Sequence, residues 1–295
     1  MRLAAIVCFL DEERLLPTFL ASVSAQTRPP ERLVLVDDGS RDASRAIATD
    51  FTLRAPYARV IALPQRPAGQ DRLAGASELR AFQAAVDSLE PGFDLVGKLD
   101  ADLDLPKRFF EEIVAAFEAD AGLGIAGSYL STRNDDGTTR RERGPAHHVR
   151  GASRFYRWEC FEKVSPIPPL LGWDTIDETR ARMHGWDVRA LELSDGDPIH
   201  LRPTGSYDGA ALRGFRRIGY AAWGYGAHPL GVLAGAGSRM RERPLLLGGL
   251  AFLWGWLQAA VRRWPRAEPE TRAYYRAEQL SRMQKALRRR STAAM

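Results

Sequence analysis

The sequence predicts an α/β protein with a mostly parallel, doubly wound sheet, followed by a helical extension that associates with a membrane. Apolar runs rich in β-branched residues alternate with helical patterns through the first half of the chain, which is typical of parallel strands joined by helices. Acidic residues gather where those predicted strands end. At Pro244 the composition changes to a run of eighteen uncharged residues.

Five apolar runs in the first half are the predicted strands, and helical patterns separate them. Strands are expected at 2–9, 32–38, 59–63, 94–100 and 123–130, and helices at 12–25, 41–53, 76–89 and 106–120. A later region adds a β-rich segment at 147–158, a helix at 175–184 and a strand at 187–193. Ligands of such sheets bind beyond the carboxyl ends of the strands, so the acidic residues there are expected to share one crevice.

Composition and charge restrict the class of protein. The net charge is +5 and the basic residues concentrate in the C-terminal part, beside apolar sequence, which suggests anionic lipid as readily as nucleic acid. The partners expected for the whole chain are a membrane surface and no nucleic acid. Only Cys8 and Cys160 are present, so a disulfide framework is not expected and a reducing compartment is favoured. The first ten residues are interpreted as a strand and not as a signal peptide, because acidic residues follow at once.

The segment KLDADLDLP at 98–106 places carboxylates at the end of a predicted buried strand. Asp100 and Asp102 have the spacing that lets both side chains approach one divalent cation and its waters. A hard cation there would neutralise charge on a diphosphate as a phosphate bond breaks. The alternative is a solvated acidic loop without a ligand.

The segment VDDGS at 36–40 closes the second predicted strand. Asp37 and Asp38, followed by Gly39, predict a tight strand-to-helix turn in which a carboxylate accepts a hydrogen bond from a nucleobase or a ribose hydroxyl. The alternative is an Asx turn with helix capping by Ser40 or Asp42.

Taken together, FLDEE, VDDGS and KLDAD at three successive strand ends resemble family-2 glycosyltransferases of the GT-A fold, over about residues 1 to 205. The resemblance implies a nucleotide-diphospho-sugar donor, with UDP favoured, and Mg²⁺ or Mn²⁺. It implies that Asp38 recognises the base, that Asp37 supports the nucleoside pocket, and that Asp102 is the main metal ligand with Asp100 beside it. Asp11 stands where the family usually has Asn, in a position facing the nucleotide.

The family also places a catalytic carboxylate before a helix that ends in Gly, and GWDTIDETRARMHGW at 172–186 fits that pattern. Counted back from Gly185 the base is Asp174, and counted forward from Trp173 it is Asp177. We favour Asp174, because the spacing from helix to glycine is set by geometry. The competing interpretation is that Asp174 is the N-cap of the helix.

Further candidates are single residues near the expected crevice. Arg72 and Lys98 are interpreted as contacts of the diphosphate or sugar, although each is more often a surface or structural charge. His200, just after the last predicted strand, is a candidate third metal ligand. Arg202 beside it is a candidate diphosphate contact.

The run PLLLGGLAFLWGWLQAAV at 244–261 is at the lower length limit for crossing a bilayer. Its glycines, tryptophans and flanking arginines fit an interfacial or re-entrant helix equally well. A buried core helix is the third interpretation. The segment 271–290 that follows predicts a basic amphipathic helix.

The sequence therefore predicts a catalytic domain at 1–210, with a nucleotide-sugar-binding half at 1–105 and an acceptor half at 106–210, and a membrane-associating extension at 211–295. The expected function is inverting, metal-dependent transfer of a sugar from a nucleotide sugar to a lipid-linked or glycan acceptor. The expected location is the cytoplasmic face of the cell membrane. A nucleotidyltransferase and a non-catalytic nucleotide-sugar-binding protein remain as alternatives.

Overall fold

The computed structural model of the chain describes residues 1–65, 76–133, 137–142, 146–202, 211–241 and 244–293. The chain divides into two compact units. The sheet unit comprises Met1–Pro166 and His184–Pro203, and the helical unit comprises Ile167–Met183 and Thr204–Met295. Residues 167–183 thus group with the C-terminal helices, and the domain boundary expected at residue 210 stays a prediction.

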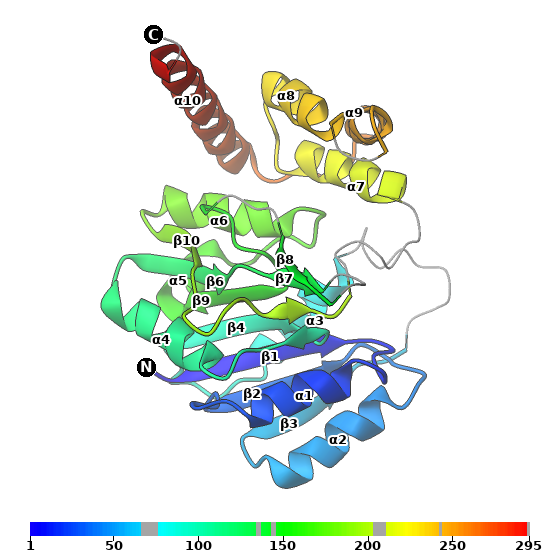
Figure 1. The fold of residues 1–295 in the computed structure, drawn as a ribbon, viewed down its shortest axis with the longest axis vertical. Helices are drawn as coiled ribbons and strands as arrows, with labels where there is room; N and C mark the ends of the chain where they lie inside the picture. The colour runs from blue at the N-terminus through cyan, green and yellow to red at the C-terminus, as the bar shows by residue number, and fades with distance from the viewer. Residues whose placement is uncertain (66–75, 134–136, 143–145, 203–210, 242–243, 294–295) are drawn as a thin grey trace. The chain divides into compact units, whose positions relative to one another are not determined.

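The sheet unit is built on a mixed seven-stranded sheet, mostly parallel as the sequence predicts (Figure 1). In spatial order the strands are β10 (Asp187–Leu191), β6 (Leu123–Ser128), β9 (Ser153–Arg157), β4 (Leu95–Asp100), β1 (Leu3–Phe9), β2 (Arg32–Asp37) and β3 (Ala58–Ala62). Only β9 is antiparallel to its sheet neighbours β4 and β6. A smaller four-stranded sheet has the order β5 (Leu103–Asp104), β11 (Ile199–His200), β7 (Ser131–Arg133) and β8 (Thr139–Arg141).

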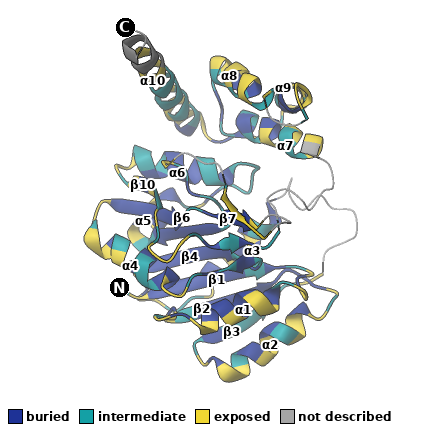
Figure 2. Ribbon diagram, in the orientation of Figure 1, coloured by how far each residue is buried: buried dark blue, intermediate teal, exposed yellow. Residues whose placement is uncertain are grey.

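Among the described residues of the sheet unit, five helices cover both faces of the large sheet. They are α1 (Leu16–Ser24), α2 (Ser44–Arg54), α3 (Ser77–Val86), α4 (Phe109–Ala119) and α5 (Trp158–Val164). Strand β9 shows how alternation builds the two cores. Phe155 packs against Phe109 of α4 with ring centroids 5.7 Å apart, whereas Tyr156, one residue on, packs against Phe82 of α3 at 6.3 Å. Figure 2 shows the resulting buried strands between helices with exposed outer faces.

Strand register brings the acidic strand ends to one edge of the large sheet. Strand β1 lies between β2 and β4, and Phe9 pairs with Asp37 while Cys8 pairs with Asp100. Because these strands are parallel, their carboxyl ends meet at the same edge. The site described below is built at this edge.

The helical unit contains α6 (Trp173–Met183), α7 (Ala211–Gly224), α8 (Pro229–Arg239), α9 (Leu247–Val261) and α10 (Pro269–Ala293). Helices α7 and α9 pack backbone to backbone through glycines. A Cβ added at Gly219 would lie 2.2 Å from the Phe252 carbonyl oxygen, and one at Gly255 would lie 2.0 Å from that of Arg216. Within the described part of the chain, no helix combines the length and the apolarity needed to cross a membrane.

Element boundaries differ from the expected ones mainly at helix starts. Helix α1 begins at Leu16 and not at Glu12, because Glu12 to Leu15 form a turn closed by the Leu15 N–H on the Glu12 carbonyl at 3.1 Å. Pro17 then occupies the first turn of the helix, where its missing N–H costs no hydrogen bond. Helix α6 begins at Trp173, two residues before the predicted start.

The glycine of β6 that faces β9 gives a direct test of the sheet packing. A Cβ at Gly127 would lie 1.9 Å from the Ser153 carbonyl oxygen, so Gly127→Ala forces two strands apart. We expect Gly127→Ala to lower the free energy of unfolding by about 1–3 kcal/mol, measured by urea denaturation. Gly237→Ala is the matched control, because a Cβ there meets nothing within 4 Å in helix α8 and alanine favours helix. An unchanged midpoint for Gly127→Ala would contradict this packing.

Candidate active site

Asp100, Asp102 and His200 form a cluster at the edge where β4 ends. Each offers one ligand atom, and these atoms all lie within 4.8 Å of one another. The small sheet holds them together, because His200 of β11 pairs with Leu103 of β5 and the Leu201 N–H donates to the Asp102 carbonyl at 2.9 Å. Two carboxylates and an imidazole at this spacing fit a single divalent cation. The three metal ligands expected from the sequence are therefore adjacent in the structure.

The imidazole of His200 lies between two carboxylates. Its Nε2 is 3.3 Å from Asp102 Oδ1, and its Nδ1 is 3.1 Å from Glu142 Oε1. Burial lowers the pKa of His200, but the hydrogen bonds to Asp102 and Glu142 outweigh it and raise that pKa to about 10. Glu142 is in turn held by Arg150 at 3.1 Å. A carboxylate behind the far ring nitrogen is the usual support of a metal-binding histidine.

Lys98 is fully buried inside β4 and lies behind Asp100. Its Nζ donates to Asp100 Oδ1 at 2.7 Å and to the Gly151 carbonyl at 2.9 Å, and it also pairs with Glu78 of α3. Burial raises the pKa of Asp100, but the Lys98 charge outweighs this and holds that pKa below its usual range. The buried ammonium thus fixes one oxygen of Asp100. The expected contact of Lys98 with phosphate or sugar stays a prediction.

Arg202 links the loop after β1 to the end of β4. Its guanidinium donates to Glu12 Oε1 and, at 3.3 Å, to Asp102 Oδ2. The side chain remains partly exposed. Arg202 therefore lies beside the cluster, and its expected role at a diphosphate stays a prediction.

The turn after β2 uses both oxygens of Asp37. Asp37 Oδ1 accepts from the Ser40 N–H at 2.7 Å, and Oδ2 pairs with Arg45 of α2. The Asp38 N–H donates to the Phe9 carbonyl at 2.9 Å, which ties this turn to the end of β1. Gly39 has a φ of 89°, and a Cβ there would lie 2.8 Å from Gln65 Cα. The turn is thus an Asx-type turn, and Asp37 acts in it as a structural support.

Asp11 and its neighbours join the ends of β1 and β2. Asp11 has a φ of 53°, and its Oδ1 accepts from the Arg41 N–H at 2.8 Å. Glu13 accepts from the Ala43 N–H at 3.1 Å, at the start of helix α2, where a negative charge is favourable. The acidic segment after β1 therefore holds the loop that precedes α2.

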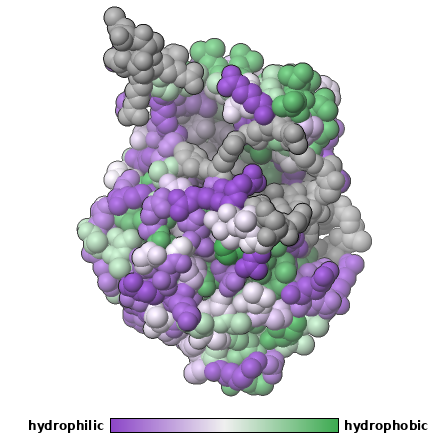
Figure 3. Space-filling view, in the orientation of Figure 1, coloured by the Kyte–Doolittle hydropathy of each residue, from purple (hydrophilic) through white to green (hydrophobic). Residues whose placement is uncertain are grey.

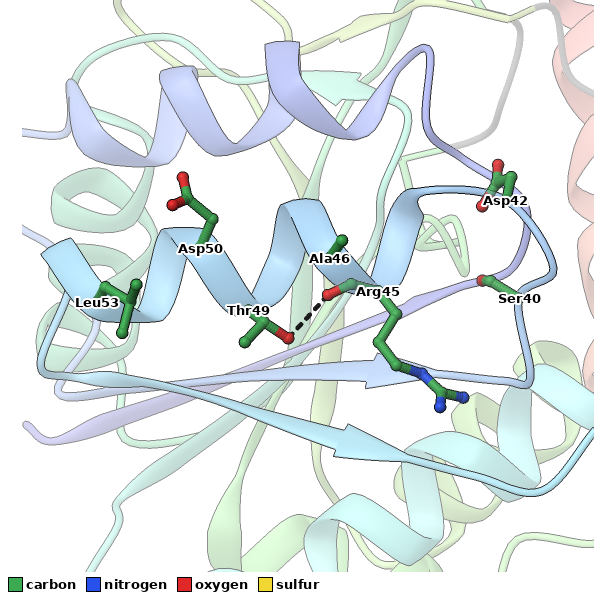
Figure 4. Close-up of a pocket in the computed structure, with 7 residues that line it drawn as sticks. All are labelled: Ser40, Asp42, Arg45, Ala46, Thr49, Asp50 and Leu53. Carbon is green, nitrogen blue, oxygen red and sulfur yellow. Dashed lines mark hydrogen bonds between the residues drawn. The ribbon is translucent and has the colours of Figure 1, made fainter.

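A hollow of about 600 Å³ lies along helix α2 beside this turn (Figure 4). Its lining residues are Ser40, Asp42, Arg45, Ala46, Thr49, Asp50 and Leu53. None of the three clustered metal-ligand candidates lines it. Figure 4 shows Arg45 extending from the start of α2, toward the strand ends.

The two candidate bases lie on α6, in the helical unit. Asp174 is in the first helical turn and is half-buried, whereas Asp177 and the adjacent Glu178 are buried. The helix start is closed by Gly172, whose carbonyl accepts from the Thr175 N–H at 3.0 Å. The N-cap interpretation of Asp174 is therefore wrong, because the helix already includes Trp173.

Helix α6 is held by α10 and by the residue that precedes it. Arg180 pairs with Glu268 at 2.7 Å, and Arg182 pairs with Glu278 at 2.9 Å. Burial raises the pKa of Tyr225, the residue after α7, well above its usual range, and the nearby Asp174 charge adds to this. The candidate base therefore belongs structurally to the C-terminal helices.

Sequence reasoning missed the acids around the cluster. Glu142 and Glu78 each contact a residue of the predicted site but belong to no strand-end motif. Glu12 lies within FLDEE, but its pairing with Arg202 was not predicted. Only long-range pairing of β7, β8 and β11 brings Glu142 to His200. Arg72 lies outside the described residues.

A mixed, mostly parallel sheet with a carboxylate–imidazole cluster beyond β4 and an aspartate turn beyond β2 defines a GT-A glycosyltransferase fold. The family comparison agrees, since the profile of Glycosyl transferase family 2 matches residues 4–169. The chain belongs to this family, as its strand-end motifs predict.

A curated relative is the undecaprenyl-phosphate 4-deoxy-4-formamido-L-arabinose transferase of Pseudomonas fluorescens (strain Pf0-1). It is 31% identical over 140 residues, which are 46% of this chain and 37% of the relative. The match thus spans little more than a third of that protein.

Solved structures share the fold at low sequence identity. The mannosyltransferase PcManGT of Pyrobaculum calidifontis, in complex with GDP-Man and Mn²⁺, has a TM-score of 0.54 at 16% identity, over 97% of this chain and 80% of that one. TarS 1-349 of S. aureus, in complex with UDP-GlcNAc, has a TM-score of 0.54 at 15% identity, over 75% of this chain and 66% of that one. The GT-A fold expected from the sequence is confirmed.

Glu142 is expected to control metal affinity through His200. Glu142→Ala removes the acceptor of the Nδ1–H, and we expect Mn²⁺ binding measured by calorimetry to weaken about 10–100-fold. Glu142→Gln retains a hydrogen-bond acceptor for His200 and should lose less Mn²⁺ affinity than Glu142→Ala. Glu111→Ala is the control, because it removes an equal charge from a carboxylate paired with Arg108, outside the cluster. Equal Mn²⁺ affinity of wild type and Glu142→Ala would rule out this support.

Proposed function

We propose that the chain is an inverting, metal-dependent glycosyltransferase that transfers a sugar from a nucleotide-diphospho-sugar to a lipid-linked or glycan acceptor at a membrane surface. The observation that carries this proposal is the Asp100–Asp102–His200 cluster, set at the same sheet edge as the Asp37–Asp38 turn. Membership of Glycosyl transferase family 2 supports it.

The proposed donor is a UDP-sugar held across this edge, with Mg²⁺ or Mn²⁺ at the cluster. Asp38 and Asp11 would face the nucleoside, while Asp37 holds the turn. The cation would neutralise charge on the departing diphosphate, with Arg202 and Arg72 adding positive charge. The cations Lys98 and Arg202 already compensate the carboxylates of the cluster, which supports its stability before a donor binds.

The proposed base is Asp174. A general base must reach the acceptor hydroxyl, and Asp174 is half-buried whereas Asp177 is fully buried. The base would take the acceptor proton while that oxygen attacks the anomeric carbon opposite the diphosphate, which inverts the configuration. The buried Asp177 would support the helix.

The proposed acceptor is a hydroxyl group of a lipid-linked or growing glycan, at the cytoplasmic face of the cell membrane, with peripheral or monotopic attachment. The name of the curated relative, an undecaprenyl-phosphate transferase, supports this class of acceptor. Released products separate the alternatives. Nucleoside diphosphate indicates glycosyl transfer, pyrophosphate indicates nucleotidyl transfer, and neither indicates a binding protein without turnover.

Donor binding tests the metal cluster. We expect calorimetry with UDP-, GDP- and dTDP-sugars to show binding of one donor that requires Mn²⁺ or Mg²⁺ and disappears with chelator. Asp102→Asn should weaken that binding by at least about tenfold, because it removes a ligand charge. Asp104→Asn, two residues further on and outside the cluster, is the matched control. Donor binding that survives both chelator and Asp102→Asn would disprove the metal role.

Turnover tests the base. Asp174→Asn should lower the rate of nucleoside diphosphate release in the presence of a lipid-linked glycan acceptor by about 10²–10⁴-fold, with donor affinity unchanged. Asp177→Asn is measured in parallel, together with its stability. If Asp174→Asn retains turnover while a folded Asp177→Asn loses it, the base is Asp177.

A further inference from the structure

Helix α9 is apolar on both sides, yet one side is exposed. The inner side consists of Gly248, Gly249, Phe252, Gly255 and Ala259. The outer side, which we name the α9 ridge, is between 48% and 76% exposed and consists of Leu247, Leu250, Trp254, Leu257 and Val261. A helix that is apolar all round is normally buried in a core or in a membrane. The ridge therefore lacks the solvent-facing character of an ordinary surface helix.

The distribution of small and large residues is the reverse of that in a water-soluble helix pair. Glycines of α9 make the contact with α7 and α8, whereas leucines and a tryptophan face outward. Small residues at helix contacts and large apolar residues outside are typical of helices in lipid, where lipid tails solvate the large side chains. Figure 3 shows apolar atoms over α8 and α9 at the top of the view, and Figure 2 shows the exposed turns.

The neighbouring helix and the preceding loop extend this apolar surface. Leu230 and Leu233 of α8 are more than half exposed, as are Leu245 and Leu246 just before α9. Exposed leucines at this density on a monomer usually mark an interaction site.

The charge around the ridge indicates the partner. Residues 211–267 contain nine arginines and one glutamate. Arg241, Arg262 and Arg263 are exposed near the two ends of α9. A second copy of the chain would bring these arginines against one another, whereas an anionic bilayer neutralises them.

The length of α9 defines how it meets a bilayer. Its 15 residues span roughly 22 Å, less than the hydrocarbon core of about 30 Å. Because α9 is too short to cross and packs one side on α7 and α8, its exposed side would enter one leaflet while the helix stays on one side of the bilayer.

We propose that the α9 ridge, with Leu230 and Leu233 of α8, inserts into one leaflet of an anionic bilayer and holds the enzyme on the membrane. This deepens the proposed function, because it identifies the surface that brings the site to a lipid-linked acceptor. The surface itself does not depend on which sugar is transferred.

The test is flotation of the full chain with vesicles of phosphatidylcholine, with and without phosphatidylglycerol. We expect binding to the anionic vesicles with a blue shift of tryptophan emission, and loss of part of that shift in Trp254→Phe. The double variant Leu250→Ser/Leu257→Ser should bind at least about tenfold more weakly. The matched control is Leu53→Ser on α2, which removes an 80% exposed leucine from the sheet unit and should bind like wild type.

A second variant separates the electrostatic contribution to membrane binding from the contribution of the inserted apolar side chains. Arg262→Gln/Arg263→Gln should weaken binding to anionic vesicles and leave the weaker binding to neutral ones unchanged. Absence of vesicle binding by wild type at low salt would overturn the proposal. So would a dimer, seen by sedimentation, that Leu250→Ser/Leu257→Ser dissociates while no vesicle binding occurs. Donor binding is measured by calorimetry on the same variants. Loss of vesicle binding with donor binding retained indicates a lost membrane surface, whereas absence of donor binding in wild type indicates that the proposed function has failed.

Discussion

The candidate site depends on a buried ammonium in the middle of the sheet. A charged lysine inside a strand is costly unless its hydrogen bonds are satisfied, and Lys98 satisfies them with Asp100, Glu78 and the Gly151 carbonyl. This set joins the central strand to α3 and to the loop before β9. Asp100 is therefore presented at the strand end by the interior of the protein and not by a flexible loop.

The other charged groups around the cluster also lie next to groups of opposite charge. Asp102 faces His200 and Arg202, and His200 faces Glu142, which faces Arg150. Carboxylates and cationic side chains alternate, so the net charge of the cluster is close to zero before any metal ion binds. A divalent ion would replace contacts that protein cations make at present, and its affinity reflects the difference between the two sets of interactions.

Local sequence patterns predicted the structural features that depend on residues close together in the chain. The parallel strands, the Asp100–Asp102 pair and the Asp37 turn all depend on strand ends that can be recognised from a few residues. His200 was found only through its place after the last strand. Glu142, Glu78 and Glu12 were missed because their partners lie 58, 20 and 190 positions away, and only the small sheet and the packed helix bring them in. The start of α6 was misplaced because Gly172, and not an aspartate, closes its first turn.

Helix α6 belongs to the helical unit, so the candidate base and the candidate metal ligands lie in different compact units. The groups suited to a nucleotide and a cation belong to the sheet, while the candidate base is fastened by Arg180 and Arg182 to the C-terminal helices that also carry the α9 ridge. In the proposed function, donor binding and acceptor activation therefore depend on residues of different units. A substitution in the sheet unit would then alter donor binding and one in the helical unit acceptor activation, so the two steps of the proposed reaction can be changed separately.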